Sequence, residues 1–484
     1  MGPWHWYAVA VHAALCIAAG AGVLCLRREH DPLLHNWAGC YLAGELLLTV
    51  FVLATGFLPV GLTGVLLAMA VVGVVAGVAP SLRRGAGPLR GAGPRPLLAI
   101  GLALLWLLLF PQLLMTVQLT VPYEWDARSI WLMHGKALLH GGGLRAAFFC
   151  DPHMLWSHVD YPLLIPAQAA CCARLFGGWD DQVARAFLLL DFLAYGRLLL
   201  PILRARGHGP VFATAVGVLL FAQGVPGVVL GELYVSGQAD YHYAMPLALA
   251  VLLLCPPFGG AGRPLAVLLA ARAAAVKNEG TALVAAGLAL CALVGGWRWL
   301  RARPRPRWRD LPAARRTEVV AGLAALLLPA AMWGLWKHLH GVSGDLHLGA
   351  RALTPGLLAT ALAERAGPVL RLMGEQALAN GLHWLLLAWV VLAAAGVWLG
   401  RATASGAGWM RAEAAVAVAA LAVCAAAFAT YVLSPHDVGW HVSTSAGRVL
   451  FLPQLLLFAL CLFRCEALRR ARGGDCPGSR ARGT

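Results

Sequence analysis

Apolar runs of about 20 residues, separated by short polar stretches, recur along almost the whole chain and constrain its fold more than any other feature. A run of this length crosses a bilayer as a helix, because a helix satisfies its own backbone hydrogen bonds inside lipid. Of the 484 residues, 60% are hydrophobic and 12% are charged, whereas soluble domains carry roughly 25% charged residues. The sequence therefore predicts an all-α, polytopic membrane protein.

The apolar runs predict about 13 transmembrane helices, of which the one at 263–277 is short enough to be tilted, broken or re-entrant. The first three form an N-terminal element (1–96), followed by a transmembrane core (97–466) and a basic, disordered cytoplasmic tail (467–484). The expected helices lie near residues 4–26, 34–57, 60–80, 97–119, 183–203, 211–231, 241–257, 263–277, 280–297, 318–337, 381–399, 413–433 and 449–466.

Arginine-rich loops predict the orientation of these helices. The loops at 81–96 and 298–316 carry many arginines and almost no acids, and such loops stay on the cytoplasmic side of the cytoplasmic (inner) membrane. The formal charge of +16 is thus a topology signal that at most helps to bind anionic lipids, and we expect no nucleic-acid partner. The loops expected on the periplasmic or extracellular side are residues 120–182, 232–240, 277–280, 338–380 and 434–448.

Two segments of the first outer loop predict juxtamembrane helices that lie on the outer membrane surface. Residues 127–140 place apolar side chains opposite basic ones at helical spacing. Residues 161–176 are apolar but short, and they contain two prolines and Arg174. Counting 161–176 as a membrane span would instead reverse the orientation of every later helix.

Ionisable residues at the edge of a membrane are costly, so those in the outer loops are candidates for function. A carboxylate in a partly dry site can act as a base on a hydroxyl or amine, and Lys or Arg suits a phosphate. Ordinary surface ion pairs, such as one between Lys277 and Glu279, are the competing interpretation. The candidates are Glu124, Asp126, His158, Asp160, Tyr161, Glu232, Asp240, Lys277, Asn278, Glu279, His441 and Arg448.

The sequence gives little support for a metal site or for nucleotide-driven chemistry. His338, His340, Asp345 and His347 have ligand-like spacing, but they complete no recognisable motif. A GxGxxG, Walker or GxSxG motif is absent, which argues against ATP-driven transport and serine hydrolysis. The cysteines, which form no CxxC pair, are interpreted as small core residues. We expect no metal cofactor; Mg²⁺ or Mn²⁺ is the less favoured alternative.

Several motifs resemble those of GT-C glycosyltransferases, which include protein O-mannosyltransferases and lipid A aminoarabinose transferases. "YEWDARSIW" (123–131) resembles their first outer loop. "HVDYPLLIP" (158–166) is similar to their His-Pro-Pro-Leu motif but has Val159 and Asp160 where the prolines would be. "GQADYHY", "VKNEG" and "GWHVSTSAGR" look like an uncharacterised bacterial branch. The resemblance covers residues 97–466.

The resemblance implies a glycosyltransferase that takes a sugar from a polyprenyl-phosphate donor and passes it to an unidentified acceptor at the outer membrane surface. By position, Asp126 corresponds to the acidic residue that activates or orients the acceptor, and we expect Glu124 to assist it. Lys277 and Arg448 would hold the donor phosphate and stabilise its growing negative charge. The other candidates would orient or bind the two substrates.

The alternative from another class is a transporter or flippase of a lipid-linked or anionic substrate. We favour the enzyme because mid-span charge is sparse and consists of Glu45 and Arg272. A non-catalytic subunit of a cell-envelope assembly complex is a further alternative. Such a subunit would not need acids, Lys and Arg gathered from four separate loops.

Overall fold

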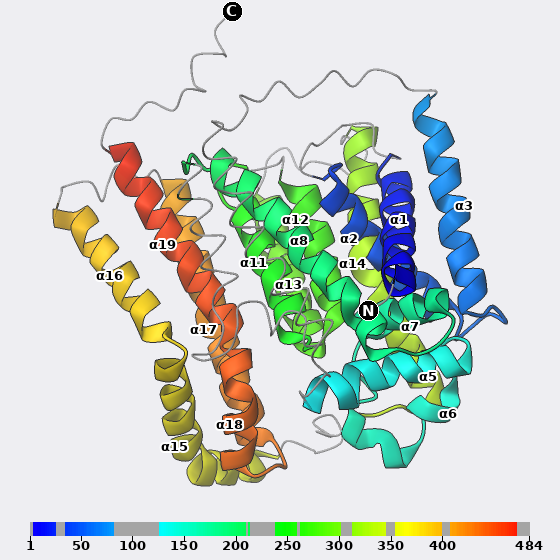
Figure 1. Cartoon of the computed structure of the whole chain (residues 1–484). Helices are drawn as coiled ribbons and strands as arrows, with labels where there is room; N and C mark the ends of the chain where they lie inside the picture. Colours follow the sequence, from blue (N-terminus) through cyan, green and yellow to red (C-terminus); the bar gives the residue numbers. More distant parts are fainter. Residues whose placement is uncertain are drawn as a thin grey trace, which may run out of the picture. The chain divides into compact units, whose positions relative to one another are not determined.

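The computed structural model describes residues 3–25, 34–81, 125–209, 212, 238–258, 262–301, 312–344, 354–398 and 407–471. Within these ranges all regular secondary structure is helical (Figure 1), which confirms the all-α prediction. Six of the described helices are long and apolar enough to cross a membrane, or up to seven if a bent helix pair forms one span. These helices support a membrane protein, while the full number of 13 spans remains a prediction.

Most of the predicted spans coincide with observed helices. Those at 97–119 and 211–231 lie outside the described residues, apart from Phe212. The matching helices are α1 (Pro3–Cys25), α2 (Trp37–Ala54), α3 (Leu62–Ser81), α8 (Asp181–Ala205), α11 (Asp240–Leu254), α12 (Arg263–Val276), α13 (Asn278–Arg301), α14 (Ala313–His340), α16 (Leu382–Trp398), α17 (Ala407–Leu433) and α19 (Phe451–Ala471).

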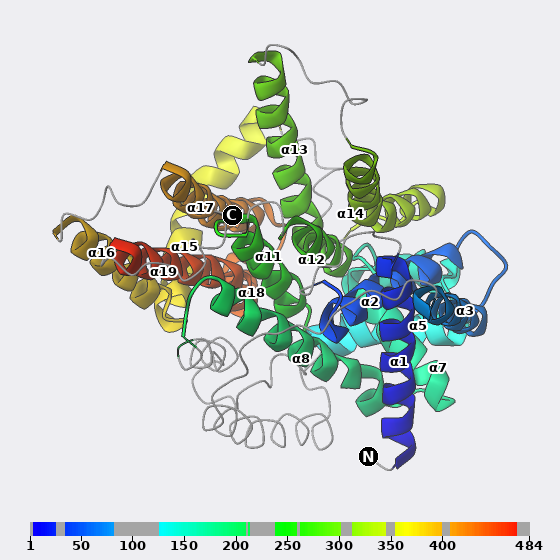
Figure 2. The ribbon, with the colours of Figure 1, turned by 90° about the horizontal axis from the view of Figure 1, so that it is seen from above.

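The chain divides into two compact units. Unit 1 comprises Met1–Pro201, Pro210–Pro246 and Ala261–Asp345, and unit 2 comprises Ile202–Gly209, Leu247–Gly260 and Leu346–Thr484. In unit 1, α1 lies beside α2 and α3 in both views (Figures 1 and 2), and α2 also packs against α7, α12 and α14.

Glycines allow α1 and α2 to approach each other closely. A Cβ atom added at Gly44 would lie 1.9 Å from the carbonyl oxygen of Cys16, and one added at Gly20 would lie 1.9 Å from that of Cys40. Small residues at such positions let helix backbones pack in direct contact, which is a common way for membrane helices to associate.

The first outer loop of the prediction is helical and packs at the end of unit 1 where α2 ends and α3 begins. Its elements are η1 (Ala127–Leu132, a π-helix), α5 (Met133–Gly141), α6 (Ala146–Phe149), η2 (Pro152–Ser157) and α7 (Leu164–Phe176). The backbone N–H of Leu144 donates to Thr55 Oγ1 at 2.7 Å, and that of Leu62 donates to the Gly142 carbonyl at 2.9 Å. These bonds attach the loop to the turn between α2 and α3.

Helix α7 differs from the surface helix expected at 161–176. Every residue from Leu164 to Ala173 is buried, because α7 packs against α1, α2 and α5. Its Gln168 side chain donates to the Glu45 carbonyl at 3.0 Å and lies 2.9 Å from His12 Nε2. With 13 residues, α7 is about 20 Å long, which is too short to cross a bilayer.

Unit 2 contains two helices where outer loops were expected. Helix α15 (Pro355–Ala379) occupies much of the 338–380 loop, and α18 (Val438–Val449) occupies most of the 434–448 loop. Helices α15 and α16 are bent by 74° at a short break. Helix α15 lies beside α18, and α16 lies beside α19 (Figure 1).

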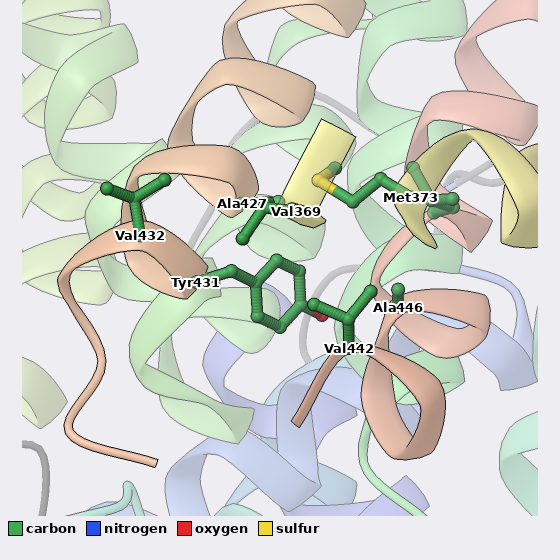
Figure 3. Close-up of a cluster of buried hydrophobic side chains, with 8 residues drawn as sticks. Val369, Met373, Ala427, Tyr431, Val432, Val442 and Ala446 are labelled. Carbon is green, nitrogen blue, oxygen red and sulfur yellow. The ribbon is translucent and has the colours of Figure 1, made fainter. Parts of the chain in front are cut away.

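A buried apolar cluster holds α15, α17 and α18 together (Figure 3). The ring of Tyr431 lies within it, and the Tyr431 hydroxyl is 2.9 Å from Ser445 Oγ. The cluster consists of Val369, Met373, Ala427, Tyr431, Val432, Val442, Ala446 and Leu450.

Substituting Gly44 should separate α1 from α2. In Gly44→Ala the new methyl group meets backbone rather than a flexible side chain, and overpacking of this kind costs about 1–3 kcal/mol. We expect a lower melting temperature in detergent, measured by intrinsic fluorescence. Gly287→Ala on α13 is the matched control, since an added Cβ meets nothing within 4 Å there. Equal melting temperatures for the two variants would contradict the close contact.

Acidification should destabilise the packing of α5 through His134. Ser157 Oγ donates to the Ser129 carbonyl, so it accepts from His134 Nε2, which lies 3.2 Å away. The other ring nitrogen, Nδ1, is buried without a hydrogen-bond partner among the described residues. Burial lowers the pKa of His134 from 6.5 to about 3. Between these values the unfolded chain binds the proton and the folded protein does not, so stability falls as pH falls.

The expected loss is about 1.4 kcal/mol per pH unit below pH 6.5. His134→Gln keeps a donor at the Nε2 position but cannot titrate, so it should flatten the pH dependence of the melting temperature between pH 7 and pH 5. If the wild-type protein and this variant lose stability in parallel, His134 is not the responsible group.

Candidate functional site

Three segments that are distant in sequence meet at one end of unit 1. They are the loop after η2, the first turn of α11, and the turn between α12 and α13. Lys277 lies at the centre, with its Nζ atom 2.9 Å from Asp240 Oδ1 and 3.1 Å from Glu279 Oε1. Its backbone is extended, which ends α12 and lets α13 begin at Asn278.

Lys277 is a buried cation held by two acids. It is 7% exposed, and its Nζ lies 5.9 Å from the ring centres of both Tyr161 and Tyr243. Burial alone would lower the pKa of Lys277, but Asp240 and Glu279 outweigh burial and hold the pKa well above its ordinary value. The interpretation as a simple surface pair with Glu279 is therefore wrong, because Asp240 of another helix also binds this ammonium.

The Asp160 carboxylate has one bound oxygen and one that no described residue contacts by a hydrogen bond. Its Oδ2 accepts from Asn278 Nδ2 at 2.7 Å, and its backbone carbonyl accepts from Trp333 Nε1 at 2.9 Å and from Lys337 Nζ at 3.1 Å. Its Oδ1 is buried and lacks a hydrogen-bond partner among the residues that the structure describes. A buried acceptor of this kind is costly, and a substrate hydroxyl or amine would satisfy it.

Stacked rings line the same region. Tyr161 stacks on Trp131 with ring centres 5.3 Å apart, and on His158 with ring centres 4.9 Å apart. His158 has a φ of 51°, which is uncommon for a residue other than glycine. Such backbone strain is concentrated at functional sites. Tyr161 thus connects this ring stack to the Lys277 ammonium.

Asp126 begins the π-helix that carries Trp131. In a π-helix each residue lies one turn from the fifth residue after it, so Asp126 lies one turn before the ring stack. Short π-helical segments occur frequently at functional sites. Two of the other predicted acids, Glu124 and Glu232, lie outside the described residues.

His441 and Arg448 belong to unit 2 and lie on helix α18 rather than in a loop. The Arg448 guanidinium donates to the Thr444 carbonyl one turn earlier, at 3.2 Å. The His441 ring meets the edge of Tyr431 with ring centres 4.9 Å apart.

A second polar network lies between the packed helices of unit 1. Of its residues, the sequence singled out only Glu45 and Arg272 as charges within membrane spans. Arg272 NH2 is 2.8 Å from Glu45 Oε2, and it also binds Asp191. His242 Nδ1 is 2.9 Å from Asp191 Oδ2. Asp191 could have been found from the sequence, because it is an acid within an apolar run. Its pairing across 81 positions with Arg272 has no local signature.

The described residues contain no group of three or more His, Cys, Asp or Glu side chains arranged to hold a metal ion. Asp240, an acid that could serve as an oxygen ligand, is paired with Lys277. His340 stacks on Trp336 with ring centres 4.4 Å apart. Asp345 and His347 lie outside the described residues.

Lys337 and Trp333 are the site residues that sequence reasoning missed. Both lie near the end of the apolar run that forms α14, where they resembled ordinary interfacial residues. The predicted residues that the structure brings together are His158, Asp160, Tyr161, Asp240, Lys277, Asn278 and Glu279.

Comparison of the chain with models of protein families, with curated proteins and with solved structures finds no match.

Proposed function

We propose that the protein is a membrane glycosyltransferase that moves a sugar from a polyprenyl-phosphate donor to an acceptor. The observation that supports this best is the cluster at one end of unit 1. It combines a carboxylate oxygen of Asp160 that has no partner among the described residues, two ammonium groups and a stack of aromatic rings. These are the groups required to bind a hydroxyl, a phosphate and a sugar ring.

In this reaction a carboxylate accepts the proton of the acceptor hydroxyl as its oxygen attacks the anomeric carbon of the sugar. The bond from that carbon to the phosphate oxygen breaks, and its electron pair leaves with the polyprenyl phosphate. The sequence motif favours Asp126, with Glu124, as the base. The geometry supports Asp160 more directly, because its Oδ1 atom is buried and has no donor among the described residues.

Lys337 is the cation best suited to the leaving phosphate. Among the described residues its ammonium donates to the Asp160 carbonyl and lies 5.6 Å from the centre of the Trp333 ring, and the nearby Asp160 carboxylate attracts it without forming a direct ion pair. Lys277 is already bound to two acids and holds Asp240 and Glu279 in position. Fixed positive charge beside the leaving group stabilises the charge that develops there. The sequence motif also predicts Arg448 as a phosphate ligand.

The charge of the helix ends supports an outward-facing site in the cytoplasmic membrane. Helices α12, α13 and α14 have one end in the cluster, at Lys277, Asn278 and Lys337 respectively. Their opposite ends carry arginines, which favour the cytoplasmic side. These arginines are Arg263, Arg301 and Arg316.

A transporter is the second candidate, and the buried network of unit 1 favours it. Mid-span charge is less sparse than the sequence analysis assumed, because Asp191 and His242 join Glu45 and Arg272. Transporters place ionisable groups within the membrane interior. Purified protein in vesicles separates the candidates: an enzyme forms a glycosylated product, whereas a transporter moves an intact substrate across the bilayer.

Asp160→Asn should reduce sugar transfer by about 10²–10⁴-fold, which is the usual contribution of a general base. Transfer is measured with lipid extracts that contain labelled polyprenyl-phosphate sugars. Asp126→Asn, assayed in parallel, decides between the two acids. Asp151→Asn is the control, because Asp151 caps η2 and Asn caps helices equally well. Full activity in both test variants would exclude Asp160 and Asp126 as the catalytic base.

The two lysines should respond differently to substitution. Lys337→Gln should weaken donor binding by about 10–100-fold, since a hydrogen bond to a charged group contributes about 1.5–3 kcal/mol, while the melting temperature stays near that of the wild type. Lys277→Met should instead destabilise the fold by about 3–5 kcal/mol, because it leaves Asp240 buried without its cation. A stable Lys277→Met protein with weakened donor binding would reverse the two roles.

A further inference from the structure

The network within unit 1 contains more acid than base. Glu45, Asp191, His242 and Arg272 come from α2, α8, α11 and α12, and their side chains are fully buried. Two ionised carboxylates and one guanidinium would leave one negative charge uncompensated. An uncompensated charge in a sealed, apolar interior is strongly unfavourable. One bound proton would make the network neutral.

The geometry indicates where that proton is held. Both carboxylates bind the same NH2 atom of Arg272, which brings them side by side. Glu45 Oε1 and Asp191 Oδ1 are buried and have no partner among the described residues. Contact between two carboxylates is repulsive when both are ionised and attractive when one carries a proton. One proton shared between the two carboxylates would remove this repulsion.

A proton on His242, instead of on one of the carboxylates, would explain these contacts less well. A neutral imidazole already donates through Nδ1 to Asp191 Oδ2, which lies 2.9 Å away. An imidazolium would balance the charge, but both unpartnered carboxylate oxygens would remain unsatisfied. Asp191 accepts from both Arg272 and His242, whereas Glu45 accepts from Arg272 alone. Glu45 is therefore the residue that carries the proton.

We propose that Glu45 and Asp191 form a proton-binding site inside the helix bundle, with one proton on Glu45 donated to Asp191. The site does not depend on the proposed transferase activity. Among the described groups that face the site, Arg272 carries the only permanent positive charge. The other groups are His12 and Cys16 of α1, Tyr41 of α2, Gln168, Cys171 and Cys172 of α7, Tyr195 of α8, and His242 of α11.

Infrared difference spectroscopy of the purified protein tests the site, because a protonated carboxylic acid has a carbonyl stretch that an ionised carboxylate lacks. At neutral pH we expect this band in the wild-type protein and its loss in Glu45→Gln. Asp191→Asn should also lose it, since one carboxylate then balances Arg272 and Glu45 ionises. Glu318→Gln, the same substitution at an exposed position of α14, should leave the spectrum unchanged.

Two results would overturn the proposal. One is a wild-type spectrum at neutral pH without a carboxylic-acid band. The other is a band that persists in Glu45→Gln or in Asp191→Asn, because the proton would then be bound elsewhere or would not depend on the charge balance. If Glu45→Gln fails to fold, the wild-type and Asp191→Asn spectra still decide the question. Carbon-13 labelling of glutamate in the wild-type protein then identifies the residue type by the shift of the band.

Discussion

A charged side chain in an apolar helix interior must be neutralised by its neighbours, and the arrangement of unit 1 depends on this constraint. Arg272 of α12 meets it by binding Glu45 of α2 and Asp191 of α8. Breaking such a buried pair costs about 3–5 kcal/mol, so the three helices are held in a defined register. The Lys277 cluster is built on the end of one of these helices, and its position follows from theirs.

The two polar networks share helices α11 and α12. Asp240 and His242 are two residues apart on the first turn of α11, which separates them by about 200° around the helix axis. One can therefore bind Lys277 while the other binds Asp191. On α12, Arg272 lies within the helix and Lys277 ends it. A short stretch of each helix thus connects the proposed proton-binding site to the Lys277 cluster.

Local patterns predicted the helices made of continuous apolar runs, such as α2 and α14, because such runs need no knowledge of their partners. They failed for α15 and α18, whose apolar residues occupy one face between polar ones; Val438, Val442 and Ala446 recur every fourth position of α18. Lys277 and Asp240 were predictable as charges at the ends of runs. Their pairing was not, because the two residues are 37 positions apart in sequence.

Asp160 carries most of the support for the proposed group transfer at the Lys277 cluster. Its carbonyl holds Lys337, and its carboxylate keeps one unpartnered oxygen among the described residues. A single residue therefore positions both a cation and a buried carboxylate oxygen, which are the two groups that the proposed transfer requires. The Glu45 network is fully buried, and a transported substrate would have to reach it from both sides of the membrane. In the proposed function the Lys277 cluster binds the substrates, whereas the interior network binds a proton.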